Sequence, residues 1–348
     1  MKRALLLVAL GACAHGAQQP QRVEIISEPT VITAGPPELV PLGEMDDATL
    51  FDAGTRAFQG GEFEKAAQYF DRLWESFPES PNRVPALWNA ALSEERLGRS
   101  GEALQRFDEY IKFKDEPEAQ LHAALAEHEL RRLDDAAARL HKLAERPGLA
   151  LLTKASALMQ EGVCRIEGGA RADGEVVLRQ ALEIYEDVAH EEPVDPSLPA
   201  QAEFWLGEAY RGSFHAVRLD PSAMDEKALG DALETKAEFL LSAQGHYLRC
   251  IRRGDGEWAT AAGFRIGELY EALHDELLGA PLPPGLTDEQ RALYQSELRK
   301  KVRDLVQKAI RVYEETLSVA QRTGASSAYV QKTQAALDRM RALLLGND

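Results

Sequence analysis

The chain has few of the features that mark an enzyme, a metalloprotein or a nucleic-acid-binding protein. Its 348 residues include three cysteines and contain no GxxxxGK[ST] phosphate loop, HExxH zinc pair or GxSxG nucleophile motif. The eight histidines are scattered, and His122 and His128, six residues apart, do not share one helix face as metal ligands would. Asp and Glu outnumber Lys and Arg by 57 to 40, and this negative charge disfavours binding to DNA or RNA. We therefore expect a non-enzymatic protein with no cofactor and no bound metal.

The first apolar run, residues 4–12, is too short to span a bilayer and follows a basic start, as in a signal peptide. It ends in the motif Leu-Gly-Ala-Cys at residues 10–13, which resembles a bacterial lipobox. The resemblance implies that residues 1–12 are a lipoprotein signal peptide and that Cys13 becomes the lipid-modified first residue. Because Ala14 and not an aspartate follows, it also implies a lipid anchor at the periplasmic face of the outer membrane. An ordinary secretory signal that contains a cysteine is the alternative.

Cys164 and Cys250 are the two remaining cysteines, and they could pair in an oxidising compartment. Each lies inside an apolar helical run, however, and the repeat register places them on helices of non-neighbouring units. We expect two buried, unpaired thiols, with a disulfide as the alternative.

Residues 13–46 are rich in proline and have no helical period, which predicts an extended tether that begins at the lipidated Cys13. Fully extended, such a tether reaches on the order of 100 Å at about 3.1 Å per residue. Two stretches within it, residues 23–27 and 30–33, have strand-like composition. A simple spacer is one interpretation; the other is a segment that adds a strand to a partner or lies along the protein's own surface.

The next part of the chain repeats a helical pattern three times. Residues 47–78 read as two short helices joined by a double-glycine turn, with small residues where the helices must approach closely. The small residue of the second helix recurs at Ala66, Ala103 and Ala136, at spacings of 37 and 33 residues. These residues resemble the tetratricopeptide (TPR) repeat, whose period is about 34 residues. The resemblance implies three regular TPR units over residues 47–150.

Beyond residue 150 the helical units are longer. The segment Ala202–Tyr210 returns sixty residues later as Ala262–Tyr270, and both resemble the first helix of a TPR unit. Each is expected to be followed by an insertion, at Gly212–Met224 and Gly279–Leu286, and then by an unusually long second helix.

Local signals predict the last two helices. Thr287 and Gln290 have the spacing of a capping box and open a long helix that ends at Arg322. A final helix, Ser327–Leu345, has one apolar face and is expected to cap the last exposed core. The whole pattern predicts an all-α protein: a TPR-type α-solenoid of about six helix pairs with a C-terminal capping helix. Residues 151–348 supply extended TPR-like pairs with insertions.

Two stretches, residues 77–91 and 202–210, are similar to segments of envelope TPR proteins. The types are BamD of outer-membrane β-barrel assembly, the YbgF/CpoB family of the Tol-Pal system, and TPR lipoproteins of myxobacterial gliding motility. The resemblance implies a non-enzymatic periplasmic scaffold for protein–protein interaction, anchored to the outer membrane, that organises a motility or transport complex. The alternatives are a BamD-like factor in outer-membrane protein assembly and, from another class, a cell-wall enzyme or its direct activator.

A TPR groove is lined by one face of each repeat's first helix. In this register the predicted groove residues are Phe51, Thr55, Phe58, Trp88, Leu92, Arg96, Leu121, Leu125 and His128. This face is apolar and aromatic, which suits a hydrophobic helix or an extended protein segment. A clamp for a peptide carboxylate is not expected, since only Asn89 fits one. The alternative is that part of the stripe packs against a neighbouring repeat or the tether.

A basic island interrupts the acidic sequence near the C-terminus. It consists of Arg299, Lys300, Lys301 and Arg303. A solvated helix face is one interpretation, and a contact for an acidic partner or for phospholipid headgroups is the other.

Overall fold

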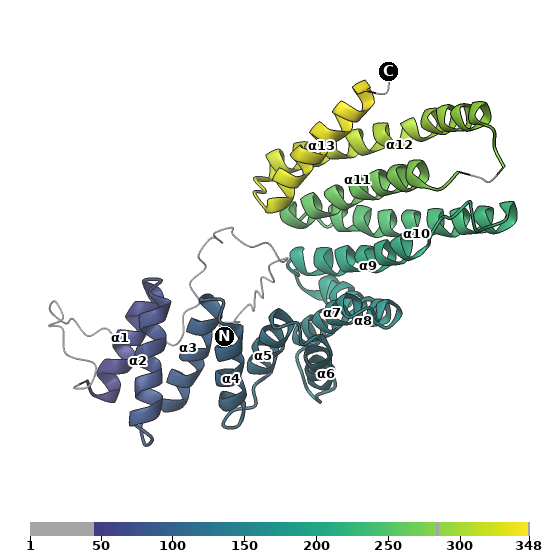
Figure 1. Cartoon of the computed structure of the whole chain (residues 1–348). Helices are drawn as coiled ribbons and strands as arrows, with labels where there is room; N and C mark the ends of the chain where they lie inside the picture. Colours follow the sequence, from purple (N-terminus) through teal and green to yellow (C-terminus); the bar gives the residue numbers. More distant parts are fainter. Residues whose placement is uncertain (1–44, 283–284, 347–348) are drawn as a thin grey trace. The chain divides into compact units, whose positions relative to one another are not determined.

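The computed structural model describes residues 45–282 and 285–346 (Figure 1). Within these ranges the chain forms thirteen helices and no strand. The expected signal peptide, the lipidation site Cys13 and all but the last two residues of the tether lie outside the described residues.

The helices follow one another as six pairs and a thirteenth helix. They are α1 (Asp47–Gln59), α2 (Phe63–Ser76), α3 (Arg83–Arg96), α4 (Ser100–Ile111), α5 (Pro117–Glu129), α6 (Leu133–Ala144), α7 (Leu151–Glu167), α8 (Arg171–Glu191), α9 (Ser197–Ala216), α10 (Glu226–Arg252), α11 (Gly256–Gly279), α12 (Asp288–Thr323) and α13 (Ala328–Gly346). This order confirms the expected all-α, TPR-type α-solenoid with an additional C-terminal helix.

The chain divides into two compact units, and the boundary falls inside α9, between Ala209 and Tyr210. Helices α1–α6 are 12 to 14 residues long, whereas α7–α13 are 17 to 36 residues long. The lengthening begins at α7, but the sequence pattern did not predict the unit boundary near residue 209.

In the N-terminal unit each helix from α1 to α8 packs against the next. Glycine allows the closest approaches: a Cβ on Gly54 would lie 2.7 Å from Phe70 Cε1, and one on Gly162 would lie 2.6 Å from Leu178 Cγ. The small and the large residue are sixteen positions apart in both pairs. This shared spacing places the two helices of a repeat in the same register each time.

Two arginines of this unit pair with a buried glutamate of their own repeat and with a more exposed aspartate of the preceding repeat. Arg139 on α6 donates to both oxygens of Glu127 on α5, at 2.9 and 2.8 Å, and lies 3.0 Å from Asp108 on α4. One repeat earlier, Arg106 lies 3.5 Å from the equivalent buried carboxylate, Glu94, and donates to an aspartate on α2. Because Glu94 and Glu127 are only 4% and 3% exposed, each depends on its arginine partners for stabilisation.

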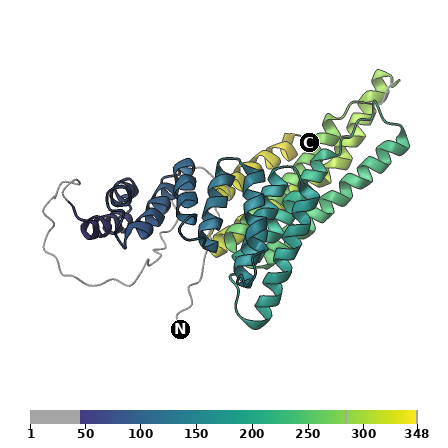
Figure 2. The same cartoon turned by 90° about the horizontal axis from the view of Figure 1, so that it is seen from below.

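In the C-terminal unit the long helices α10, α11 and α12 lie side by side, and α13 packs on α11 and α12 (Figures 1 and 2). The predicted capping box at the start of α12 is confirmed: Gln290 N donates to Thr287 Oγ1, and Thr287 N donates to Gln290 Oε1. The helix ends at Thr323 and is capped by Gly324, whose φ of 73° is in the left-handed region that glycine adopts readily.

The first expected insertion is shorter than the sequence predicted. It was expected to begin at Gly212, but α9 continues to Ala216. A glycine inside a helix costs about 1 kcal/mol relative to alanine. Burial of the aromatic side chain of Phe214, which is 0% exposed, outweighs that cost. The second insertion, expected to begin at Gly279, begins one residue later, because α11 includes Gly279.

Cys164 and Cys250 are both buried, as predicted, and no disulfide joins them. The Cys250 thiol donates to the backbone oxygen of Trp258 at 3.5 Å. Burial raises the pKa of the Cys164 thiol to about 12, so this thiol stays protonated at neutral pH. Within the described ranges, no helix is both long enough and apolar enough to cross a membrane.

Candidate protein-binding face

The first helices of the regular repeats, α1, α3 and α5, contact one another through side chains. Phe58 of α1 packs against the cluster that contains Leu92 of α3. The Trp88 ring of α3 lies edge-on to the His122 ring of α5, with 5.5 Å between centroids. His122 Nδ1 also lies 2.7 Å from Glu95 Oε2, back on α3. These contacts form one continuous surface, which we call the first-helix face.

Seven of the nine predicted groove residues reach the solvent on this face. Arg96 is exposed, and the other six are partly exposed: Phe51, Thr55, Phe58, Trp88, Leu125 and His128. The other two, Leu92 and Leu121, are corrections to the prediction, because they are only 7% and 3% exposed. Leu92 belongs to a core cluster with Ala103 and Phe107, so it fills the seam between helices and cannot contact a partner directly.

Two aromatic residues of the face pack against buried rings of the second helices. Phe51 packs edge-on against Phe70 with centroids 5.7 Å apart, and Trp88 packs in the same way on Phe107 at 5.5 Å. Internal packing, the alternative left open by the sequence, therefore accounts for part of each ring. The rest of each ring stays accessible, and a ring held in place loses little conformational entropy when a partner covers it.

At the α5 end of the first-helix face, polar contacts connect the face to α7. His128 Nε2 lies 2.9 Å from Glu167 Oε2 on α7, and Arg131 donates to the same oxygen at 2.6 Å. The hydrogen bond from His128, followed by that from Arg131, lowers the pKa of Glu167. The sequence reading missed Glu167, because its partners come from another repeat and no local motif marks it. His128 is therefore tied to α7 as well as being on the candidate surface.

Asn89 cannot serve a carboxylate clamp, because it is only 3% exposed. Its Oδ1 is buried without a hydrogen-bond partner in the described part of the chain. Nor do the described residues bring together three or more His, Cys, Asp or Glu side chains in a metal-binding arrangement.

The basic island lies on α12, in the C-terminal unit, and all four of its residues are exposed. Arg299, Lys300 and Arg303 line a pocket there, whereas Lys301 does not. The structure therefore separates the four residues into a group of three and a single lysine outside the pocket.

Comparison with known proteins supports the fold. A family model for the tetratricopeptide repeat matches residues 49–80, which span α1 and α2. No curated protein sequence matches the chain. The repeat match and the helix-pair architecture define a TPR-type helical-repeat protein, a class that generally provides interaction scaffolds and not catalysts.

Solved structures of similar fold share little sequence with the chain. The apo form of RapI is 11% identical with a TM-score of 0.49, covering 86% of this chain and 98% of its own. A tetratricopeptide repeat protein from Parabacteroides merdae is 13% identical with a TM-score of 0.41, covering 85% and 98%. A Rap protein in complex with competence and sporulation factor is 14% identical with a TM-score of 0.38, covering 87% and 76%.

Proposed function

We propose that the chain is a non-enzymatic scaffold that binds an apolar helix or extended segment of another protein on its first-helix face. The observation that carries the proposal is the row of pre-packed, partly exposed aromatic rings of Phe51, Phe58 and Trp88. Rigid aromatic side chains at the centre of a surface are the residues that most often dominate binding energy. The charged side chain of Arg96 would fix the orientation of the bound segment.

Variants that block this face without touching the core test the proposal. Thr55→Arg combined with Arg96→Glu adds bulk and reverses charge at two accessible positions, so partner recovery should fall about tenfold. The measurement is quantitative mass spectrometry of proteins retained by the full chain from detergent-solubilised membranes of the source organism. The matched control is Arg72→Glu, an equal charge reversal on an exposed position of α2. Equal recovery by the double variant and the wild-type chain would contradict the proposal.

We further propose that this scaffold is attached by a lipid on Cys13 to the periplasmic face of a bacterial outer membrane. The support is the lipobox-like motif at residues 10–13 and the proline-rich segment that follows. Replacing Cys13 with serine in a Gram-negative host should move the protein from the membrane fraction to the soluble periplasm. Retention of Cys13→Ser in the membrane fraction would show that another feature provides the attachment.

The complex that the scaffold organises is proposed to belong to envelope motility or transport machinery. Depletion in the source organism distinguishes this role from the alternatives. Loss of a single envelope function is expected; a general loss of outer-membrane β-barrel proteins would instead indicate a BamD-like role. A defect in cell-wall synthesis alone would indicate an activator of a cell-wall enzyme.

A further inference from the structure

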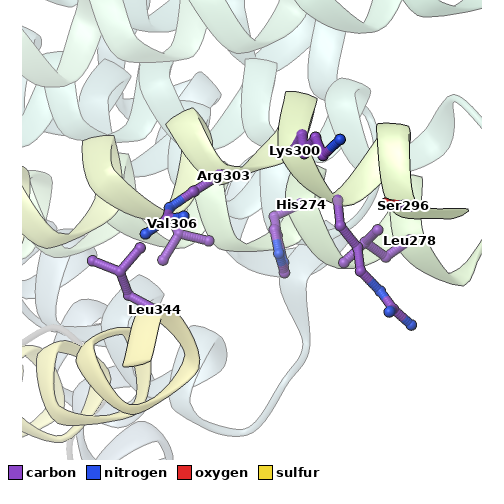
Figure 3. A pocket seen from close by; sticks show the side chains of 8 residues that line it. His274, Leu278, Ser296, Lys300, Arg303, Val306 and Leu344 are labelled. Carbon is purple, nitrogen blue, oxygen red and sulfur yellow. The ribbon is translucent and has the colours of Figure 1, made fainter. Parts of the chain in front are cut away.

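A pocket of about 230 Å³ lies between α11, α12 and α13 of the C-terminal unit (Figure 3). Ser296, Arg299, Lys300 and Arg303 all line it from α12. Ser296, Arg299 and Arg303 are three and four residues apart, so they lie on one side of that helix. Lys300 follows about 100° further around the helix and still lines the pocket. The helix therefore presents three cationic groups and one hydroxyl to the same cavity.

The rest of the pocket lining is mainly apolar. His274 and Leu278 come from α11, and Leu344 comes from α13, as Figure 3 shows. Val306 of α12 is 2% exposed and completes an apolar floor. His274 is also buried, at 3% exposed, and its Nδ1 lies 2.8 Å from Asp275 Oδ1. The pocket thus combines a cationic wall with an apolar floor.

The charge of the pocket runs against the charge of the whole protein. The chain carries a formal net charge of −17, yet among the described residues none that lines this pocket is a carboxylate. Two lining residues have an exposed acidic partner: Glu297 is 2.7 Å from Lys300 and is 53% exposed, and Asp275, the partner of His274, is 70% exposed. Exposed ion pairs of this kind stabilise little, so a multiply charged anion can replace Glu297 as the partner of Lys300.

We propose that this pocket binds a phosphomonoester whose phosphate contacts Arg299, Lys300 and Arg303 and whose carbon substituent rests on Leu278, Val306 and Leu344. Three cations balance the two negative charges of a phosphomonoester more closely than the single charge of a carboxylate. Guanidinium groups also match the fork of phosphate oxygens. The ligand is either a soluble phosphomonoester or the phosphomonoester headgroup of a lipid. This site is independent of the first-helix face and of its proposed partner.

Calorimetric titration of the full chain with phenyl phosphate tests the proposal. The wild-type protein is expected to bind in the micromolar to low millimolar range. Arg299→Gln combined with Arg303→Gln should weaken binding by at least about tenfold. Lys301→Gln, the same loss of charge on the same helix but outside the pocket, should leave it within about twofold. Absence of binding by the wild-type chain, or equal weakening by Lys301→Gln, overturns the proposal.

A second variant tests whether binding depends on the shape of the pocket or only on the positive charge of the helix. Ser296→Phe keeps every charge and places a ring in the cavity, so it should abolish binding of phenyl phosphate; unchanged binding overturns the proposal.

Vesicles of phosphatidylcholine with and without phosphatidic acid identify the source of the ligand. Binding to the phosphatidic-acid vesicles that is lost in the double variant supports a lipid headgroup, whereas binding of phenyl phosphate alone supports a soluble ligand.

Discussion

Replacing Arg139 with alanine is expected to lower the free energy of unfolding by about 3 kcal/mol. Arg139 holds both oxygens of Glu127, which is only 3% exposed, and it also reaches Asp108 of the preceding repeat. The truncated side chain would leave the Glu127 carboxylate buried without its bidentate partner. Most of the cost is therefore the desolvation of an unpaired charge and not the loss of an attractive contact.

The measurement is urea unfolding followed by circular dichroism and tryptophan fluorescence. Arg132→Ala is the matched control, because Arg132 is half exposed and lies 3.9 Å from the same glutamate; its expected effect is below about 1 kcal/mol. A double change, Glu127→Leu with Arg139→Met, removes both charges and should recover most of the loss. If Arg139→Ala costs no more than Arg132→Ala, the arginine does not stabilise the buried carboxylate.

Replacing Lys236 with alanine is expected to have an effect of similar size, about 3 kcal/mol, in the C-terminal unit. Lys236 lies on α10 and is 0% exposed. Its Nζ donates to the backbone oxygens of Phe214 and Val217, both at 2.8 Å, and lies 2.6 Å from Glu276 Oε2 on α11. One ammonium group thus satisfies the carbonyls at the end of α9, where a helix has no partners of its own, and neutralises a carboxylate.

Lys227→Ala provides the control for this variant. Lys227 is on the same helix, its side chain is 87% exposed, and it pairs with Asp231 at 3.5 Å, so its removal should change stability by only a few tenths of a kcal/mol. Hydrogen exchange should also show faster exchange at the last amides of α9 in Lys236→Ala than in the control. Equal stability and equal exchange in the two variants would show that the buried lysine does not hold the end of α9.

The regular repeats could be predicted from the sequence because their signals are local. Three turns between paired helices have a glycine with positive φ: Gly61 at 77°, Gly98 at 70° and Gly169 at 94°. The turn between α5 and α6 has Arg131 at φ 60° instead. Close approach demands a small residue, and Gly54 stands where a Cβ would collide with Phe70. Each constraint involves residues close in the chain, so spacing alone reveals it.

The candidate face was predicted less accurately. Phe51 and Trp88 are partly exposed, but Leu92 and Leu121 are buried. One helical position is about 100° of rotation, so a stripe assigned from sequence merges with the buried side at its edges. The boundary depends on how tightly the next repeat packs, which no single helix encodes.

The polar interior could not be predicted. A lysine in a long helix is normally exposed, and the groups that hold Lys236 are two backbone carbonyls and Glu276, which lies forty residues away. The pocket beside the basic island depends in the same way on α11 and α13, since Leu278 and Leu344 come from outside α12. Such sites exist only after distant helices have packed together.

Site-specific photo-crosslinking tests the central claim, that the first-helix face binds a protein partner, most directly. A photoreactive amino acid is placed at Thr55 or Arg96 on this face and, as controls, at Arg72 on α2 or Gln105 on α4, which are exposed positions of second helices. We expect the same partner protein to be crosslinked from both Thr55 and Arg96 in living cells and from neither control position. Crosslinks of equal yield from all four positions, or from the second helices alone, would contradict it.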